Sequence, residues 1–128
     1  MSNPQPGITG ITQILVNVHD VKRAIAFYRD VLGLRFLFEI PNGAFFDCGG
    51  VRLFLGLPDK PEFDHPASII YYTVADIHAT YEQFVARGVR FADKPHIVAQ
   101  MGKDDLWLAA FHDADDNLLA LMSQAPRQ

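Results

Sequence analysis

Five histidines and one cysteine are the residues best suited to chemistry, yet they form no familiar catalytic pattern. The histidines are scattered along the chain, at His19, His65, His78, His96 and His112. His96 is the most interesting of them, because it follows Pro95 in a short apolar run, and a free imidazole pKa of ~6.5 suits a base or a ligand-binding group. Cys48 has no histidine or basic neighbour in sequence, so we interpret it as a small buried apolar residue. No Ser-His-Asp pattern, Walker loop or dinucleotide-binding glycine fingerprint is present.

The acidic run Asp113–Asn117 begins like a calcium-binding loop, with acidic or amide residues at its first, third and fifth places. The pattern then fails, because Leu118 stands where glycine is required and Gln124 where the bidentate glutamate belongs. We therefore predict a plain hairpin turn.

Composition and charge exclude several classes of function. The chain has 128 residues, of which 49% are hydrophobic and 20% charged, as expected for one globular domain. A net charge of -4 without a basic stripe argues against nucleic acid as a partner. No apolar run approaches the ~20 residues of a membrane span, and the first residues do not resemble a signal peptide. A single cysteine fits a reducing compartment, so we expect a cytoplasmic protein with no membrane partner.

The elements that must position these residues are organised as a repeat. An apolar-periodic run opens at Val18-His19-Asp20-Val21 and closes at Gly33-Leu34-Arg35-Phe36, and a second run opens at Val74-Ala75-Asp76-Ile77 and closes at Gly88-Val89-Arg90-Phe91. A β-rich run precedes each copy. Such a repeat indicates two copies of one supersecondary unit.

Each copy is predicted to contain a strand, a helix and then further strands. Asp20 and Asp76 are helix N-caps, and Gly33 and Gly88 end those helices. The predicted strands are residues 11–18, 35–40, 44–48, 51–57, 68–74, 89–92, 96–99, 106–111 and 118–122, with 1–9 and 123–128 left as tails. The fold class is therefore α+β, with two tandem βαβββ modules in one domain over residues 8–124. Module 1 covers about 8–57, a proline-containing linker 58–66, and module 2 about 67–124.

One helix covers only one face of a four-stranded sheet, so the two modules should form a curved mixed sheet around a cleft. Strand alternation turns the second face of each first strand toward that cleft. The predicted ligand-binding residues of the cleft are Gln13, Leu15, Asn17, Leu53, Leu55, Ile69, Tyr71, His96, Trp107 and Met122.

The sequence resembles the vicinal oxygen chelate superfamily, which includes glyoxalase, extradiol dioxygenases, methylmalonyl-CoA epimerase, fosfomycin thiol transferases and bleomycin resistance proteins. The resemblance runs from about Ile8 to Ser123 and is carried by the repeated unit, by Ala26-Phe27-Tyr28-Arg29-Asp30-Val31-Leu32-Gly33-Leu34 and by the segment Phe111–Leu121. Proteins of this family usually have Pro and Gly where this chain has Ala114 and Asp116, which predicts a looser turn. The family also implies a homodimer.

The resemblance further implies a divalent metal held in the cleft by His, Glu or Gln at four places. Here those places are Gln13, a position near Leu53, Ile69 and Ala120. Only Gln13 can donate to a metal, and a register slip of one residue does not supply the missing donors. A metal site needs several converging donors, so we predict neither a metal nor another cofactor, and Gln13 is a relic position. The same departure disfavours metal-dependent lyase or dioxygenase activity, and no catalytic residue is assigned beyond the weak candidate His96.

Several candidate residues have a structural alternative to a functional role. Gln13 is either a relic ligand or a polar group that hydrogen-bonds in the cleft. Asn17 and Tyr71 either orient a ligand or are satisfied polar side chains on a half-buried strand. Trp107, the only tryptophan, either stacks on a planar ligand or anchors the core or a dimer interface.

The leading hypothesis is a protein that binds an apolar or aromatic small molecule in the cleft without metal, as resistance proteins do. The first alternative is a metal-dependent lyase, isomerase or extradiol-type dioxygenase that uses Gln13 with His96 or other donors. The second alternative is a structural or interaction module whose cleft is filled by its own side chains. These hypotheses differ in whether several donors converge on one point.

Overall fold

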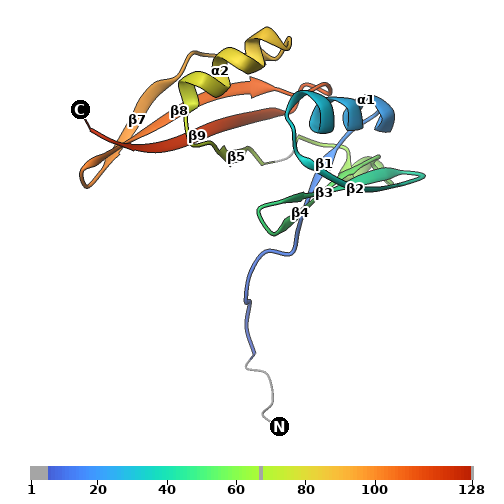
Figure 1. The fold of residues 1–128 in the computed structure, drawn as a ribbon. Coiled ribbons are helices and arrows are strands. Elements are labelled where there is room, and N and C mark those ends of the chain that lie inside the picture. Colours follow the sequence, from blue (N-terminus) through green and yellow to red (C-terminus); the bar gives the residue numbers. More distant parts are fainter. Residues whose placement is uncertain (1–5, 67, 128) are drawn as a thin grey trace.

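The first sheet is built from module 1. The structure, a computed structural model, describes residues 6–66 and 68–127, so part of the predicted N-terminal tail lies outside the described residues. Strands β1 (Gln13–Asn17), β2 (Arg35–Ile40), β3 (Gly43–Cys48) and β4 (Val51–Gly56) are arranged in the order β1-β4-β3-β2. The pair β1–β4 is parallel and the other pairs are antiparallel. Figure 1 shows this sheet below helix α1.

The first helix begins where the sequence predicts and ends in a wider turn. The Asp20 carboxylate accepts a hydrogen bond from the backbone N–H of Arg23 at 3.1 Å and so caps α1 (Val21–Ile25). The following segment, η1 (Ala26–Val31), is π-helical, with the Leu32 N–H donating to the Phe27 carbonyl at 2.9 Å. Gly33 then adopts a φ of 80°, a conformation that glycine reaches without strain.

The second sheet repeats the arrangement with one strand divided. Strands β5 (Ile70–Thr73), β9 (Leu118–Pro126), β8 (Asp104–His112) and β6 (Arg90–Phe91) follow one another, and β7 (His96–Met101) pairs with β8 beyond β6. Segments β6 and β7 both pair with β8, on either side of residues 93–95, which separate the two predicted strands. Helix α2 (Ile77–Ala86) is capped by Asp76, whose carboxylate accepts from the Ala79 N–H at 3.1 Å.

Strand β9 runs further than predicted, because its partner β8 is long. Trp107 pairs with Ser123 and Asp104 with Pro126, and the Gln124 amide donates to the Asp104 carboxylate at 2.8 Å. The segment 123–126 is therefore a strand and not an uncommitted tail. The short 3-10 helix η2 (Pro61–Phe63) lies in the predicted linker. None of the helices in the described residues is both long and apolar enough to cross a membrane.

Both helices lie on the same side of the two sheets in Figure 1. The buried hydrophobic residues of the helices and sheets form one core cluster. Each strand therefore has a covered face toward the helices and an uncovered face away from them. Val16, Leu55, Phe46 and Tyr28 of module 1 are fully buried, as are Phe111 and Ala109 of module 2. The predicted α+β fold of two tandem βαβββ modules is confirmed.

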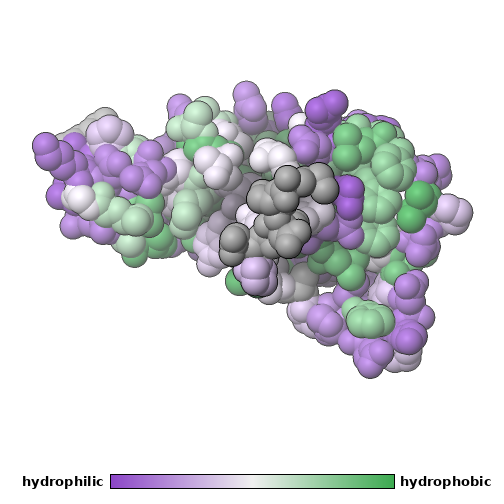
Figure 2. Space-filling model, turned by 90° about the horizontal axis from the view of Figure 1, so that it is seen from below, coloured by the Kyte–Doolittle hydropathy of each residue, from purple (hydrophilic) through white to green (hydrophobic). Residues whose placement is uncertain are grey.

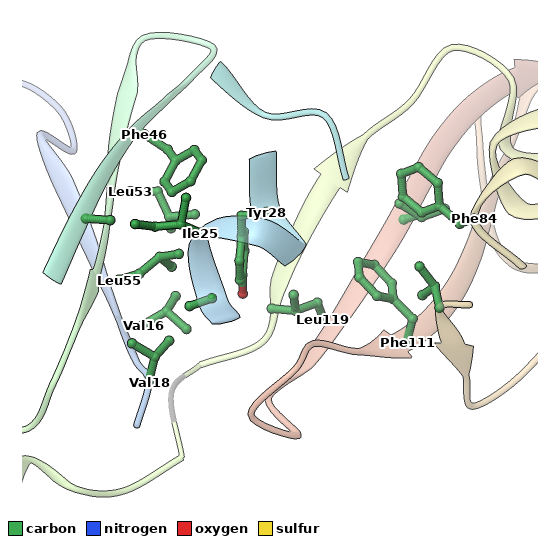
Figure 3. Close-up of a cluster of buried hydrophobic side chains, with 14 of the residues drawn as sticks. Val16, Val18, Ile25, Tyr28, Phe46, Leu53, Leu55, Phe84, Phe111 and Leu119 are labelled. Carbon is green, nitrogen blue, oxygen red and sulfur yellow. The ribbon is translucent and has the colours of Figure 1, made fainter. Parts of the chain in front are cut away.

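One buried carboxylate joins the two modules. The Tyr28 hydroxyl, which Figure 3 shows pointing away from Phe46, donates to Asp113 Oδ2 at 2.6 Å. Asp113 also accepts from the backbone N–H groups of Asp115 and Asn117 at 2.8 and 2.9 Å, and from the Asn117 amide at 2.9 Å. Burial and the nearby Asp113 charge raise the pKa of Tyr28 well above its usual value, so the phenol stays protonated and donates.

The turn after Asp113 is a hairpin turn, as the sequence predicts. Asp116 adopts the left-handed conformation, with a φ of 63°, that glycine usually supplies. The Arg90 guanidinium donates to the Asp116 carboxylate and to the Asp113 carbonyl, which holds the turn against β6. The acidic side chains of Asp113 and Asp116 therefore hold the turn in place through these hydrogen bonds.

Candidate functional site

The uncovered face of the first sheet carries two ordered rows of side chains. Strand pairing aligns Leu15, Phe54, Phe45 and Phe38 across all four strands. The neighbouring row, on the same face, consists of Gln13, Arg52, Asp47 and Arg35. An aromatic row thus lies beside a polar row, and we call the two rows together the module 1 platform.

The aromatic row contains one stacked pair of rings and a third ring tilted against it. The Phe45 and Phe54 rings are nearly parallel, with centroids 4.6 Å apart and an angle of 12° between their planes, and Phe38 lies 4.8 Å from Phe45. The Phe54 ring also covers Gly43 and Gly56, where a Cβ atom would overlap it. These two glycines let the ring lie close to the backbone, which keeps the platform flat.

Gln13 and Arg52 form a polar pair at the edge of the rings. The Arg52 Nε donates to Gln13 Oε1 at 2.7 Å, and the Arg52 guanidinium lies 5.6 Å from the Phe45 ring centroid. Stacking on an aromatic face and the hydrogen bond to Gln13 together restrain this guanidinium. Arg52 is exposed, so its remaining donors face solvent.

The uncovered face of the second sheet carries different side chains, which are mostly small or apolar. Tyr71 aligns with Ala120 and Ala110, and Thr73 aligns with Met122, Leu108 and His96. Tyr71 is 52% exposed and Ile69 43% exposed, which leaves an apolar surface with few polar groups. His96 lies on this face, where its Nδ1 is 2.8 Å from the Lys94 carbonyl oxygen.

Three of the predicted cleft residues have their side chains on the covered face of the sheets and not on the uncovered face. Leu53 and Leu55 are buried on the covered face of β4, within the core. Trp107 packs edge-on against His78 of α2, with ring centroids 4.8 Å apart, so it also lies on the covered side. In each case the register places the side chain beneath the helices, where the core requires apolar residues.

Asn17 contacts the linker through its side-chain amide nitrogen, while its side-chain oxygen is buried and finds no partner within the described residues. Its side-chain amide donates to the Phe63 carbonyl and, at 3.0 Å, to the His65 carbonyl, and so ties the linker to β1. The remaining predicted residues lie on uncovered faces and are divided between the sheets, with Gln13 and Leu15 on the first and Ile69, Tyr71, His96 and Met122 on the second.

The donor set does not fit the divalent metal that the fold family implies. No group of three or more His, Cys, Asp or Glu side chains among the described residues is arranged to hold a metal ion. At the family positions, Gln13 is hydrogen-bonded to Arg52, while Ile69 and Ala120 offer no donor atom. A fixed guanidinium beside the one remaining ligand position repels a cation, so we derive no chemistry through a metal.

The sequence reasoning did not identify Arg52, Phe45, Phe54 or Phe38 as site residues. Their signal was the alternation of β4, in which Arg52 and Phe54 point away from the face of Leu53 and Leu55. Because the sequence prediction places Leu53 and Leu55 on the cleft face, it places their neighbours Arg52 and Phe54 on the opposite face.

Fold and site together define a member of a known superfamily. Residues 10–121 match the model of the Glyoxalase/Bleomycin resistance protein/Dioxygenase superfamily, and the chain belongs to that superfamily. A superfamily member from Sphaerobacter thermophilus superposes with a TM-score of 0.76 at 25% identity, covering 91% of this chain and 98% of that one. A lactoylglutathione lyase from Agrobacterium tumefaciens superposes with a TM-score of 0.70 at 19% identity, covering 91% and 95%.

The chain is also similar in sequence to a metallothiol transferase and to an uncharacterized protein. The metallothiol transferase FosB of Staphylococcus haemolyticus is 37% identical over 73 residues, which cover 57% of this chain and 50% of that protein. The chain thus spans about half the length of this relative. The uncharacterized protein YraH of Bacillus subtilis is 27% identical over 125 residues, covering 87% of this chain and 95% of that protein.

Proposed function

We propose that the protein binds a planar aromatic small molecule with an acidic group on the module 1 platform, without a metal. The observation that carries the proposal is the Arg52–Gln13 pair, which stands beside stacked aromatic rings where the family keeps a metal ligand. The rings supply apolar contact for the ligand's plane, and the free donors of Arg52 supply a charge-assisted hydrogen bond to its acidic group.

A second copy of the chain would close this platform into a cleft. Leu15 and Phe38 on the first sheet are 44% and 51% exposed, and Tyr71 on the second is 52% exposed. In the view from the side opposite the helices, Figure 2 shows hydrophobic surface toward the β2–β4 side and polar surface toward the β7–β8 hairpin. Apolar side chains exposed in this number favour a partner surface, and a symmetric homodimer supplies one. The single free cysteine fits such a binding protein in the cytoplasm.

Calorimetric titration with 2-naphthoate tests the role of Arg52. The Arg52→Ala substitution should weaken binding about 10-fold or more, since a hydrogen bond to a charged group contributes about 1.5–3 kcal/mol. Arg23→Ala, on α1 and on the other side of the sheet, is the matched control and should leave the affinity unchanged. The neutral analogue 2-naphthamide should bind weakly to the wild type and lose little on Arg52→Ala.

The aromatic row makes a separate prediction. Phe54→Leu should weaken the binding of 2-naphthoate and of 2-naphthamide by a similar factor, because it removes ring stacking and leaves the charge of Arg52 in place. The proposal fails if planar aromatic carboxylates do not bind, or if they bind equally well to wild type and Arg52→Ala.

A metal-dependent thiol transferase is the second candidate function, and the FosB relative is the observation that favours it. That function requires a metal, for which the family positions here supply one donor, Gln13. It predicts thiol transfer to an epoxide that depends on added divalent cation and is lost on Gln13→Ala. The binding proposal predicts no such transfer.

A further inference from the structure

A cavity of about 520 Å³ lies between the two modules, on the covered side of the sheets. Leu53 and Val51 of β4 line it from module 1, and Phe84, Phe111 and Leu121 line it from module 2. Figure 3 shows Leu53 and the pair Phe84 and Phe111 as two separate groups. This volume is within the range of small-molecule sites, about 300–1,000 Å³. We call it the inter-module cavity, and it is distinct from the module 1 platform.

The wall of the inter-module cavity is apolar and carries no charged side chain among the described residues. Of the lining residues, Cys48 and Tyr72 carry polar side chains on the covered face, whereas Tyr71 and Thr73, which also line the cavity, have their side chains on the uncovered face of β5. An ion would lose its hydration here without gaining a counter-charge, which selects for neutral molecules.

The Tyr72 hydroxyl is the unusual group in this wall. It is buried and finds no hydrogen-bond partner within the described part of the chain. A buried hydroxyl left unpaired costs free energy, so an occupant of the cavity that accepted a hydrogen bond from Tyr72 would recover that cost. Burial, with a smaller contribution from Cys48, raises the pKa of Tyr72 above its usual value, so the group is a phenol that can donate.

The edge of the second sheet adds directional groups to the same wall. Strand β5 pairs with β9 on one side only, so its other edge is unpaired in the described sheet. Residues Ile70–Val74, which include β5, all line the cavity. Backbone amides and carbonyls on an open edge add hydrogen-bonding capacity to an otherwise apolar site.

We propose that the inter-module cavity binds a neutral, mainly apolar small molecule with an acceptor group that accepts a hydrogen bond from the Tyr72 hydroxyl. This site is separate from the module 1 platform in position and in chemistry. The platform carries a cation for an acidic group, whereas the cavity has an apolar wall and an uncharged donor.

The neutral naphthalene ketone Prodan is a suitable probe, because its fluorescence reports both an apolar surrounding and a hydrogen bond to its carbonyl. Binding to wild type should shift the emission to shorter wavelength. Tyr72→Phe should weaken binding about 2- to 10-fold, the effect of one neutral hydrogen bond. The same substitution should shift the emission of bound Prodan further toward the blue, a change that loss of packing alone does not produce. Tyr81→Phe, a tyrosine outside the cavity, is the matched control.

Filling the cavity should remove binding. Val51→Trp places an indole in the cavity, whereas Val85→Trp adds the same ring on the exposed side of α2. Prodan should bind to the second variant as to wild type and not to the first. If Val51→Trp does not fold, alkylation of Cys48 by N-ethylmaleimide in the wild type replaces it, because bound Prodan should slow that reaction.

Three results would overturn the proposal. The first is that wild type does not bind Prodan, and the second is that Tyr72→Phe changes neither affinity nor emission. The third is that Arg52→Ala weakens Prodan binding as much as Tyr72→Phe does, because the probe would then lie on the module 1 platform. Failure of 2-naphthoate binding, by contrast, would leave this site intact.

Discussion

The first strands of the two modules are the same element with two different uncovered faces. On the covered face, Ile14 and Leu53 pair in module 1 as Ile70 and Leu119 pair in module 2, all of them apolar. On the uncovered face, the pair Leu15–Phe54 corresponds to Tyr71–Ala120. The polar pair Gln13–Arg52 is matched in module 2 by Ile69 at the position of Gln13.

This difference shows which constraint acts on each face. The covered face must fill one core under two helices, so its apolar character is retained in both copies. The uncovered face is free of that requirement, so aromatic and charged residues gather on one copy and small or apolar residues on the other. The chemistry of this protein is therefore expected where the two copies differ most.

The largest expected effect separates the two faces of module 1. Leu55→Ala removes a fully buried side chain from the core and should lower the free energy of unfolding by about 2–5 kcal/mol. Leu15→Ala, the same change on the uncovered face of β1, should lower it by less than about 1 kcal/mol in the monomer. Urea unfolding of both variants at low protein concentration measures the difference, and equal losses would contradict the assignment of faces.

The next effect concerns the junction between modules. Tyr28→Phe removes the donor to Asp113 and leaves a buried carboxylate with one fewer hydrogen bond, which should cost about 1–3 kcal/mol of unfolding free energy. Tyr81→Phe is the control, because Tyr81 packs edge-on against Phe91 within module 2. Thermal unfolding should show a clearly lower midpoint temperature only for Tyr28→Phe. Similar midpoints for the two variants would contradict the role of Asp113 in joining the modules.

The smallest effect is a pH dependence of the contacts that His19 of module 1 makes with the linker and with module 2. His19 lies 3.0 Å from the Asp64 carboxylate and 3.5 Å from that of Asp115. The hydrogen bond to Asp64, followed by the charges of Asp64 and Asp115, raises the pKa of His19 in the folded protein. The resulting stabilisation is fully present below the unfolded pKa of about 6.5 and is lost as pH rises through the raised folded value.

Solvent screening keeps this contribution below about 1 kcal/mol, because the pair is exposed. Urea unfolding at about pH 6 and about pH 8 should show a small fall in stability at the higher pH that is absent in His19→Gln. An identical pH dependence in both proteins would show that His19 makes no such contribution.

Much of the fold follows from local sequence signals. The caps Asp20 and Asp76 and the stops Gly33 and Gly88 mark helix ends by chemistry that acts within a few residues, and the structure places them so. The π-helical turn at Ala26–Val31 has no local signal of this kind. The π-helical segment contains Tyr28, whose hydroxyl donates to Asp113, a residue 85 positions away.

The site was less predictable, because strand faces depend on register. Gln13, Leu15, Ile69 and Tyr71 were placed from the repeat, and they lie on exposed faces as expected. Leu53, Leu55 and Trp107 were chosen for apolar character, which is equally a requirement of the covered face. Leu53 and Leu55 are buried there, and Trp107 is partly buried against the core. Arg52 could be recognised only once its pairing with Gln13 across the parallel strands was known.

Metal content tests the central claim most directly, namely that Arg52 and Gln13 have replaced the family's metal. Wild type and Gln13→Ala would be incubated with nickel, zinc, manganese and iron(II), desalted and measured by elemental analysis. The account predicts no retained metal above background in either protein. Near-stoichiometric retention of one metal by wild type, lost in Gln13→Ala, would contradict it and favour a metal-dependent enzyme.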